Sequence, residues 1–268
     1  MDLGHYYHLY SQGIWQEAWK EHITALIDSS LYEHLDFIKI GMVGDKQSRE
    51  YAIDIVKQHN KVEIAAESDS GFEQVTHDVI EQDIKSPGKS FKVLYCHSKG
   101  AANHRHDQDN WRREMTNGTV YHWKECVDLL DQYDAIGCRY RASPFRHLSG
   151  NFWWATSSYL STLAQISYTY RDDAEAWIGQ GSKGGTLVEI DPSFPDLNVT
   201  PHSFGRIFVC KRDRYGHTFS NLGDIGQPIL GDEFVGFPST EGSRIIAHLM
   251  TNGATCSIIG NTIIVKSV

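Results

Sequence analysis

The residues His97-Ser98-Lys99-Gly100 carry groups that could together hold a phosphorylated ligand. Lys99 supplies a positive charge and Ser98 a hydroxyl group, while Gly100 lets a loop backbone come close to its ligand. These groups suit a diphosphate, although a tight turn with a solvated lysine would have the same local sequence. The spacing matches neither a Walker loop nor G-x-G-x-x-G, so it indicates neither an ATPase nor a nicotinamide-dinucleotide enzyme.

An alternation of strand and helix patterns must position this segment. Apolar and aromatic runs predict strands at residues 6–10, 36–44, 62–66, 91–95 and 133–137. Helical spacing of apolar residues predicts helices at 14–27, 72–84, 111–130 and near 159–163. Asp45 is placed to cap a further helix after the second strand. Asn117-Gly118 weakens the middle of the predicted helix at 111–130 by about 1 kcal/mol.

This order of elements predicts an α/β fold with a mainly parallel sheet flanked by helices. Ligands of such sheets bind beyond the carboxyl ends of the strands, and Lys99 lies just after the fourth predicted strand. Beyond residue 180, Gly, Ser and Thr are frequent, and short apolar runs predict β-hairpins or loops. We therefore expect a nucleotide-fold-like domain at residues 1–180 and an irregular, β-containing extension at 181–268.

Composition argues against several classes of protein. The 268-residue chain has 34 acidic and 25 basic residues, a net charge of −9 and no run of Lys or Arg, so a general nucleic-acid or anionic-membrane binder is not indicated. No apolar stretch approaches the roughly 20 residues that span a bilayer, and the start Met1-Asp2-Leu3 is not that of a signal peptide. Five widely spaced cysteines without a C-x-x-C pair indicate neither a disulfide framework nor a zinc knuckle. We expect a cytoplasmic protein with reduced thiols.

Five sequence blocks in the first 180 residues together carry a resemblance to a known group of proteins. They are His8-Leu9-Tyr10, Tyr95-Cys96-His97-Ser98-Lys99-Gly100-Ala101, Trp111-Arg112-Arg113-Glu114-Met115, His147-Leu148-Ser149-Gly150-Asn151-Phe152-Trp153-Trp154 and Ala174-Glu175-Ala176-Trp177-Ile178-Gly179. In this order they resemble a little-characterised group of bacterial and viral glycosyltransferase-like proteins. The resemblance implies a GT-A fold and transfer of a sugar from a nucleotide-diphosphate donor to a hydroxyl acceptor.

The resemblance also implies a general base. Inverting transfer needs a carboxylate that removes the proton of the acceptor hydroxyl. The block Ala-Glu-x-Trp-Ile-Gly places Glu175 in that role, with Asp173 as the second choice. The alternative is an acidic cluster at a helix N-terminus, which would be favourable for Asp172 and Asp173 without any catalytic role.

The predicted donor site departs from the pattern of the fold. A GT-A loop normally carries an Asp-x-Asp motif that holds a divalent metal, and this sequence has His97-Ser98-Lys99 there. We therefore expect reduced or no metal dependence, with Lys99 neutralising the diphosphate. A transition metal bound by His97 with Asp107 or Asp109 stays open. The polar segment His104-Arg105-His106-Asp107 fits a solvated or phosphate-facing loop better than a metal site.

Further donor and acceptor contacts follow from the same resemblance. Tyr10 and Ser11 end the first strand, where this fold meets the nucleoside base, and Arg112 could reach a phosphate, although a solvated helix face is the default. For the sugar or acceptor we expect contacts from Asn151, which could bind hydroxyls, and from one of Trp153 and Trp154. The other tryptophan would belong to the core.

The alternative function is a carbohydrate- or nucleotide-binding protein without turnover. The missing Asp-x-Asp and the β-rich tail permit that function, whereas the acidic residues near Glu175 favour catalysis. A nucleotidyltransferase is disfavoured, because Tyr10-Ser11-Gln12-Gly13 does not supply the Gly- and Arg-rich first loop that such enzymes use.

Overall fold

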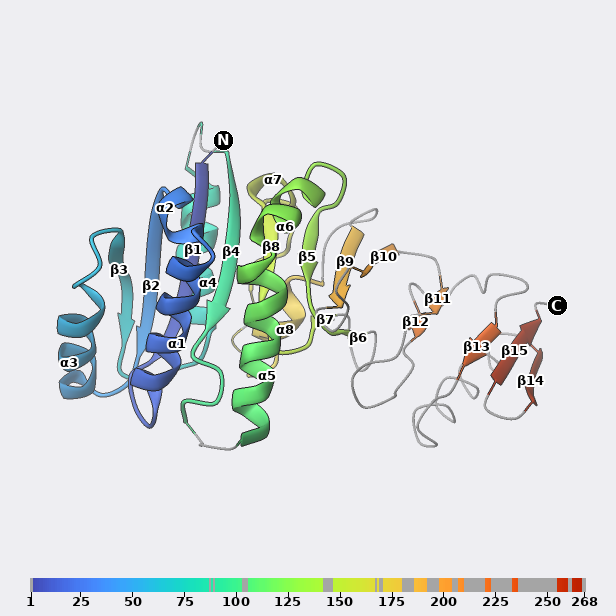
Figure 1. Ribbon diagram of the computed structural model, residues 1–268, viewed down its shortest axis with the longest axis horizontal. Helices are drawn as coiled ribbons and strands as arrows, with labels where there is room; N and C mark the ends of the chain where they lie inside the picture. The colour runs from blue at the N-terminus through green and yellow to red at the C-terminus, as the bar shows by residue number, and fades with distance from the viewer. Residues whose placement is uncertain are drawn as a thin grey trace.

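The computed structural model describes residues 2–86, 88, 90–102, 106–141, 147–166, 168 and 171–179, and beyond them seven short strands (Figure 1). These strands are β9 (Thr186–Asp191), β10 (Asn198–Ser203), β11 (Ile207–Val209), β12 (Ser220–Leu222), β13 (Glu233–Val235), β14 (Thr255–Ile259) and β15 (Thr262–Lys266). Within the described residues, no helix has the length and apolar character needed to cross a membrane.

The core of the fold is a mixed, mainly parallel sheet with the strand order β10-β9-β5-β8-β4-β1-β2-β3. Its other strands are β1 (Asp2–Tyr10), β2 (Phe37–Val43), β3 (Val62–Ser68), β4 (Phe91–His97), β5 (Ala135–Gly137) and β8 (Trp153–Thr156). Strand β1 pairs in parallel with β2 and β4, β2 with β3, and β5 with β9. Strand β8 runs antiparallel to β4 and β5, and β10 runs antiparallel to β9.

Helices cover both faces of this sheet, which confirms the predicted α/β class. The long helices are α1 (Trp15–Asp28), α3 (Lys46–Val56), α4 (Gln74–Ile84), α5 (His106–Thr116) and α6 (Trp123–Leu129). The short elements are α2 (Leu31–His34), α7 (Ser157–Leu160), α8 (Asp173–Trp177) and the hairpin of β6 (Tyr140–Arg141) and β7 (His147–Leu148). Buried residues of α1, α3, α5 and α6 share one apolar cluster, and those of α4, α7 and α8 share another.

Strand periodicity explains how the two clusters form. Successive side chains of a strand point to opposite faces, so Tyr6 joins the cluster with α4 and Tyr7 joins the cluster with α1. Trp153 and Trp154 of β8 divide in the same way. All four side chains are fully buried, which makes β1 and β8 central to both layers of the core.

Local signals in the sequence also set two helix boundaries. The Asp45 carboxylate accepts a hydrogen bond of 2.9 Å from the Ser48 amide, as predicted for the cap of α3. The single helix predicted at 111–130 is wrong, because a π-helical turn at Asn117–Tyr121 separates α5 from α6. That turn contains Asn117-Gly118, the weak point of the predicted helix.

The strands beyond residue 180 divide between two roles. Strands β9 and β10 extend the central sheet beside β5. Strands β11 and β12 form a separate hairpin, and β13, β15 and β14 form a small antiparallel sheet.

Candidate functional site

A pocket of about 440 Å³ opens beyond the carboxyl ends of β1 and β4. The chain reaches β2 and β3 on one side of β1 and β4 on its other side, so the strand order reverses between β1 and β4. In open α/β sheets, ligands bind at such a reversal. The pocket is lined by His8, Tyr10, Gly71, Phe72, Glu73, His97, Ser98, Lys99, Gly100, Ala101, Ala102, Gln108 and Arg171.

The loop after β4 lines this pocket, at the position predicted for a phosphorylated ligand. The Ser98 amide donates a hydrogen bond of 2.9 Å to the carbonyl oxygen of His8, and the Tyr10 amide donates one of 2.9 Å to Ser98 Oγ. The Ala101 amide closes a tight turn on the Ser98 carbonyl at 3.0 Å. Gly100 has φ of +84°, which favours glycine at this position. The ends of β1 and β4 are therefore tied together at the pocket.

Lys99 is a largely buried cation in the wall of the pocket, with 8% of its surface exposed. Its Nζ atom lies 4.0 Å from the centre of the Trp111 ring and 3.9 Å from Oε1 of Glu175. Burial lowers the pKa of Lys99, and the carboxylate of Glu175 opposes that shift. The ammonium group is thus held by an aromatic face and one carboxylate, not by solvent.

Glu175, the predicted general base, lies beside Lys99 on α8. Its Oε2 atom is 3.9 Å from His147 Nε2, and 24% of its side chain is exposed. Burial raises the pKa of Glu175; Lys99 lowers it and the charge of Glu73 raises it further. A carboxylate with a raised pKa is a stronger proton acceptor than an ordinary surface carboxylate.

Glu73 is a buried carboxylate in the same pocket that the sequence did not reveal. Its Oε2 atom accepts hydrogen bonds from Tyr95 Oη at 2.8 Å and from Asn151 Nδ2 at 2.7 Å. Its Oε1 atom lies 3.3 Å from His97 Nδ1. Burial alone would raise the pKa of Glu73, but the neighbouring imidazoles, first that of His97, and the Asn151 amide bring it to about 2. A single glutamate at the start of a predicted helix has no spacing signal that could have marked it.

His97 links Glu73 to the turn before β8. Its Nε2 atom lies 2.9 Å from the carbonyl oxygen of Gly150, while its Nδ1 atom faces Glu73. Burial lowers the pKa of His97 to about 4, against the opposing effect of Glu73. Both ring nitrogens face protein atoms, so the imidazole of His97 is held in place between Glu73 and the Gly150 carbonyl while it lines the pocket.

The described side chains do not fit the divalent metal that a GT-A loop normally holds. Asp109 pairs with Arg112 at 3.1 Å, and both nitrogens of His97 have protein partners. No group of three or more His, Cys, Asp or Glu side chains suited to a metal occurs in the part of the chain that the structure describes. His104 and Arg105 and the side chain of His106 lie outside the described residues.

Two predicted donor contacts lie behind the pocket and do not line it. Arg112 is 97% buried, and its Nη1 atom donates a hydrogen bond of 2.6 Å to the carbonyl oxygen of Lys99. The Ser11 hydroxyl donates a hydrogen bond of 3.2 Å to the carbonyl oxygen of Val43. Arg112 therefore holds the loop in place, and Ser11 joins the ends of β1 and β2.

The predicted sugar contacts are internal. Asn151, Trp153 and Trp154 have no exposed surface, so the expectation that one indole lines the cleft is wrong. Trp153 Nε1 donates to Asn151 Oδ1 at 2.8 Å, and Trp154 Nε1 donates to the carbonyl oxygen of Thr119 at 2.7 Å. The physical reason is that β8 lies between β4 and β5, where helices cover both faces of the sheet.

Three further residues, Arg171, Phe72 and Asp173, lie in or near the site. Arg171 adds a second cation to the pocket wall, and Phe72, with 52% of its surface exposed, adds an aromatic side chain. Neither was singled out from the sequence, although Arg171 directly precedes the acidic pair Asp172-Asp173. Asp173, the second choice for the base, begins α8, is half-buried and is not among the residues that line the pocket.

Comparison with known families places most of these residues within the match to one family model. A family model described as a domain of unknown function (DUF8361) matches residues 6–193. No curated protein matches the chain. The family match covers more than half of the chain and runs from β1 through β9, so it includes Glu73, Lys99 and Glu175. The chain belongs to the DUF8361 family.

Proposed function

We propose that this member of the DUF8361 family is a glycosyltransferase with a GT-A-like fold. It would move a sugar from a nucleotide-diphosphate donor to a hydroxyl acceptor. The observation that carries the proposal is the approach of Lys99 to Glu175, to 3.9 Å, beside the pocket at the strand reversal. These two residues come from distant parts of the sequence. Lys99 is the residue expected to neutralise the diphosphate, and Glu175 is the expected general base.

The topology supports a nucleotide donor. Strands β3-β2-β1-β4 have the order of the nucleotide-binding half of a doubly wound fold, in which phosphates bind beyond the carboxyl ends of the strands. The pocket occupies that place, and its volume of about 440 Å³ lies in the range typical of small-molecule sites. A GT-A-like fold is consistent with this half-sheet and with β8 running antiparallel beside β4.

The charges of the pocket support binding of a diphosphate. Lys99 and Arg171 are cations in its wall, and Ser98 and Gly100 belong to the same loop as Lys99. A diphosphate that pairs with Lys99 competes with Glu175 for the ammonium group. Donor binding would therefore release the carboxylate of Glu175 from its ion pair at the moment when the base is needed.

The proposed reaction uses both groups. The acceptor oxygen forms a bond to the anomeric carbon, the bond from that carbon to the diphosphate oxygen breaks, and the electron pair leaves with the diphosphate. Glu175 takes the proton of the acceptor hydroxyl, and Lys99 with Arg171 neutralises the departing charge. Because two cations are available for that charge, we propose reduced or no dependence on a divalent metal.

The first experiment is a thermal-shift panel of nucleotide sugars, each with Mn²⁺ and with EDTA, on the full chain. We expect stabilisation by at least one donor in both conditions. Calorimetry with Lys99→Ala should then show a loss of about tenfold to a hundredfold in affinity, the equivalent of one charge-assisted hydrogen bond. Lys20→Ala is the matched control, because Lys20 is an exposed lysine on α1 outside this pocket.

Two results would contradict the proposal. Unchanged donor affinity in Lys99→Ala would remove the loop after β4 as the diphosphate site. Donor binding without transfer across a broad acceptor screen would favour a nucleotide- or carbohydrate-binding protein instead of an enzyme.

A further inference from the structure

We propose, resting on the function proposed above, that Glu21 is a positioning residue for the diphosphate loop. Glu21 belongs to α1 and does not line the pocket at the loop. It acts through Arg112, whose guanidinium holds the backbone of Lys99 from behind. The expected ligand is a diphosphate, because the backbone that Arg112 holds carries Lys99, the cation proposed to bind the diphosphate.

A continuous chain of contacts joins Glu21 to the loop. Arg112 donates to Glu21 Oε2 from Nε at 3.0 Å and from Nη2 at 2.7 Å. The remaining terminal nitrogen, Nη1, donates to the carbonyl oxygen of Lys99 at 2.6 Å and lies 3.1 Å from Oδ1 of Asp109. All three nitrogens of the buried guanidinium thus have acceptors, and its orientation is fully determined.

Among the partners of the Arg112 guanidinium, Glu21 is the side chain that comes from another helix. Asp109 lies one turn before Arg112 on α5, so it moves with that helix, whereas Glu21 ties the guanidinium to α1. A Cβ atom at Gly100 would lie 3.0 Å from Cβ of Gln108 and 3.5 Å from Nη1 of Arg112, so α5 and the loop are already in close approach.

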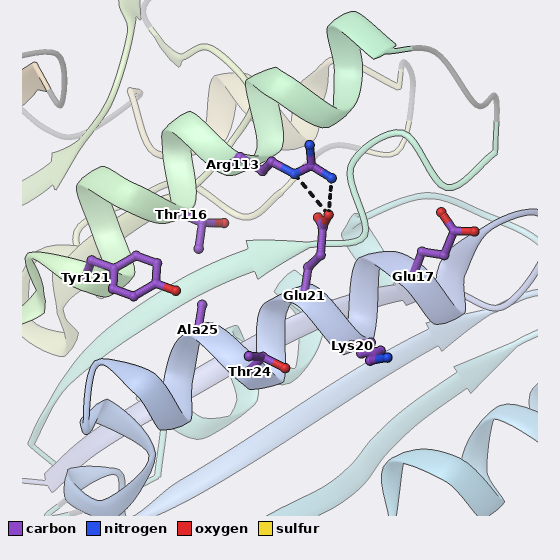
Figure 2. A pocket seen from close by; sticks show the side chains of 8 residues that line it. All are labelled: Glu17, Lys20, Glu21, Thr24, Ala25, Arg113, Thr116 and Tyr121. Atoms are coloured by element: carbon purple, nitrogen blue, oxygen red, sulfur yellow. Dashed lines mark hydrogen bonds and ion pairs between the residues drawn. The ribbon is translucent and has the colours of Figure 1, made fainter.

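The packing of α1 against α5 supplies a matched control, the neighbouring residue Arg113. Figure 2 shows Glu21 extending from α1 towards α5 in a groove of about 480 Å³, where Arg113 meets its other oxygen, Oε1. Arg113 Nε donates to that oxygen at 3.0 Å, but 62% of its side chain is exposed, and its guanidinium pairs with Glu21 and not with the backbone of Lys99 as Arg112 does. The Glu21 carboxylate therefore makes two ion pairs. The one with Arg112 is connected to the Lys99 carbonyl, and the one with Arg113 is not.

The test compares Glu21→Gln with Arg113→Gln and Glu17→Gln, using inorganic pyrophosphate as the probe and calorimetry on the full chain. Glu17 lies one turn before Glu21 in the same groove. We expect Glu21→Gln to weaken pyrophosphate binding about fivefold to tenfold, while both controls stay within about twofold of wild type. Arg112→Lys should match Glu21→Gln, because an ammonium group keeps the charge but cannot bridge Glu21 and the Lys99 carbonyl together.

Hydrogen exchange of the amides at 98–101 tests the positioning role without any ligand. We expect faster exchange of these amides in Glu21→Gln than in Arg113→Gln at matched melting temperature. Equal exchange in the two variants, or an equal loss of pyrophosphate affinity, would overturn the positioning role. If exchange is faster in Glu21→Gln but wild type does not bind pyrophosphate, the positioning role of Glu21 is supported. The proposed function is then contradicted.

Discussion

Acid should unfold this protein partly through one buried histidine pair. His5 on β1 and His22 on α1 face each other with their Nε2 atoms 2.7 Å apart, and both side chains are at least 97% buried. Nδ1 of His5 lies 3.0 Å from the carbonyl oxygen of Leu94, and the Tyr7 ring stacks on His22 at 4.6 Å. One proton can lie between the two Nε2 atoms while both rings stay neutral, so a second proton there would break this hydrogen bond and place a positive charge in the core.

Burial determines the sign and the size of the effect. It lowers the pKa of His5 from 6.5 to about 4, and it lowers the pKa of His22 well below its usual range, with His5 as the next cause. The folded protein keeps both rings neutral, while the unfolded chain takes up protons below about pH 6.5. The stabilisation is therefore present above that pH and is lost as the pH falls towards about 4. Between about pH 7 and pH 5 the loss from His5 is about 2 kcal/mol, and His22 adds a loss of the same sign.

Urea unfolding at about pH 7, 6 and 5 measures this loss. The comparison protein is the double variant His5→Gln/His22→Gln, in which amides replace the titrating rings. Other buried histidines, among them His8 and His97, have lowered pKa values and contribute the same sign in both proteins. We expect the free energy of unfolding of wild type to fall by at least about 2 kcal/mol more than that of the variant over this range. Equal losses in the two proteins would refute the reasoning.

Two predictions concern the proposed base. Glu175→Gln should keep donor affinity in calorimetry while steady-state transfer falls by about 10²–10⁴, with a smaller defect in Asp173→Asn; equal turnover in wild type and Glu175→Gln would remove Glu175 from the mechanism. Glu73→Gln should move the acid limb of the pH–rate profile to lower pH, because the charge of Glu73 raises the pKa of Glu175. An unmoved acid limb would mean that Glu73 has no electrostatic effect on the base.

The sequence by itself determined the order of elements in the first half of the chain. The strands predicted at 6–10, 36–44, 62–66 and 91–95 correspond to β1, β2, β3 and β4, and the Asp45 cap is present. These features depend on local rules: apolar periodicity within an element and a capping side chain within one turn. The position of the His97-Ser98-Lys99-Gly100 loop at the sheet edge followed from the same rules, because parallel strands bring their carboxyl ends to one side.

The tertiary structure decided which side chains reach the site. Arg112 and Trp153 had site-like types and positions in sequence, yet one holds the loop from behind and the other is packed inside the sheet. No pattern in the sequence marked Glu73, yet its carboxylate lines the pocket and accepts hydrogen bonds from Tyr95 and Asn151. The physical reason is that burial and pairing depend on strand order, and the antiparallel insertion of β8 between β4 and β5 is a long-range choice that no local periodicity encodes. That choice brings the Gly150-Asn151 turn to His97 and Glu73, with which it forms hydrogen bonds.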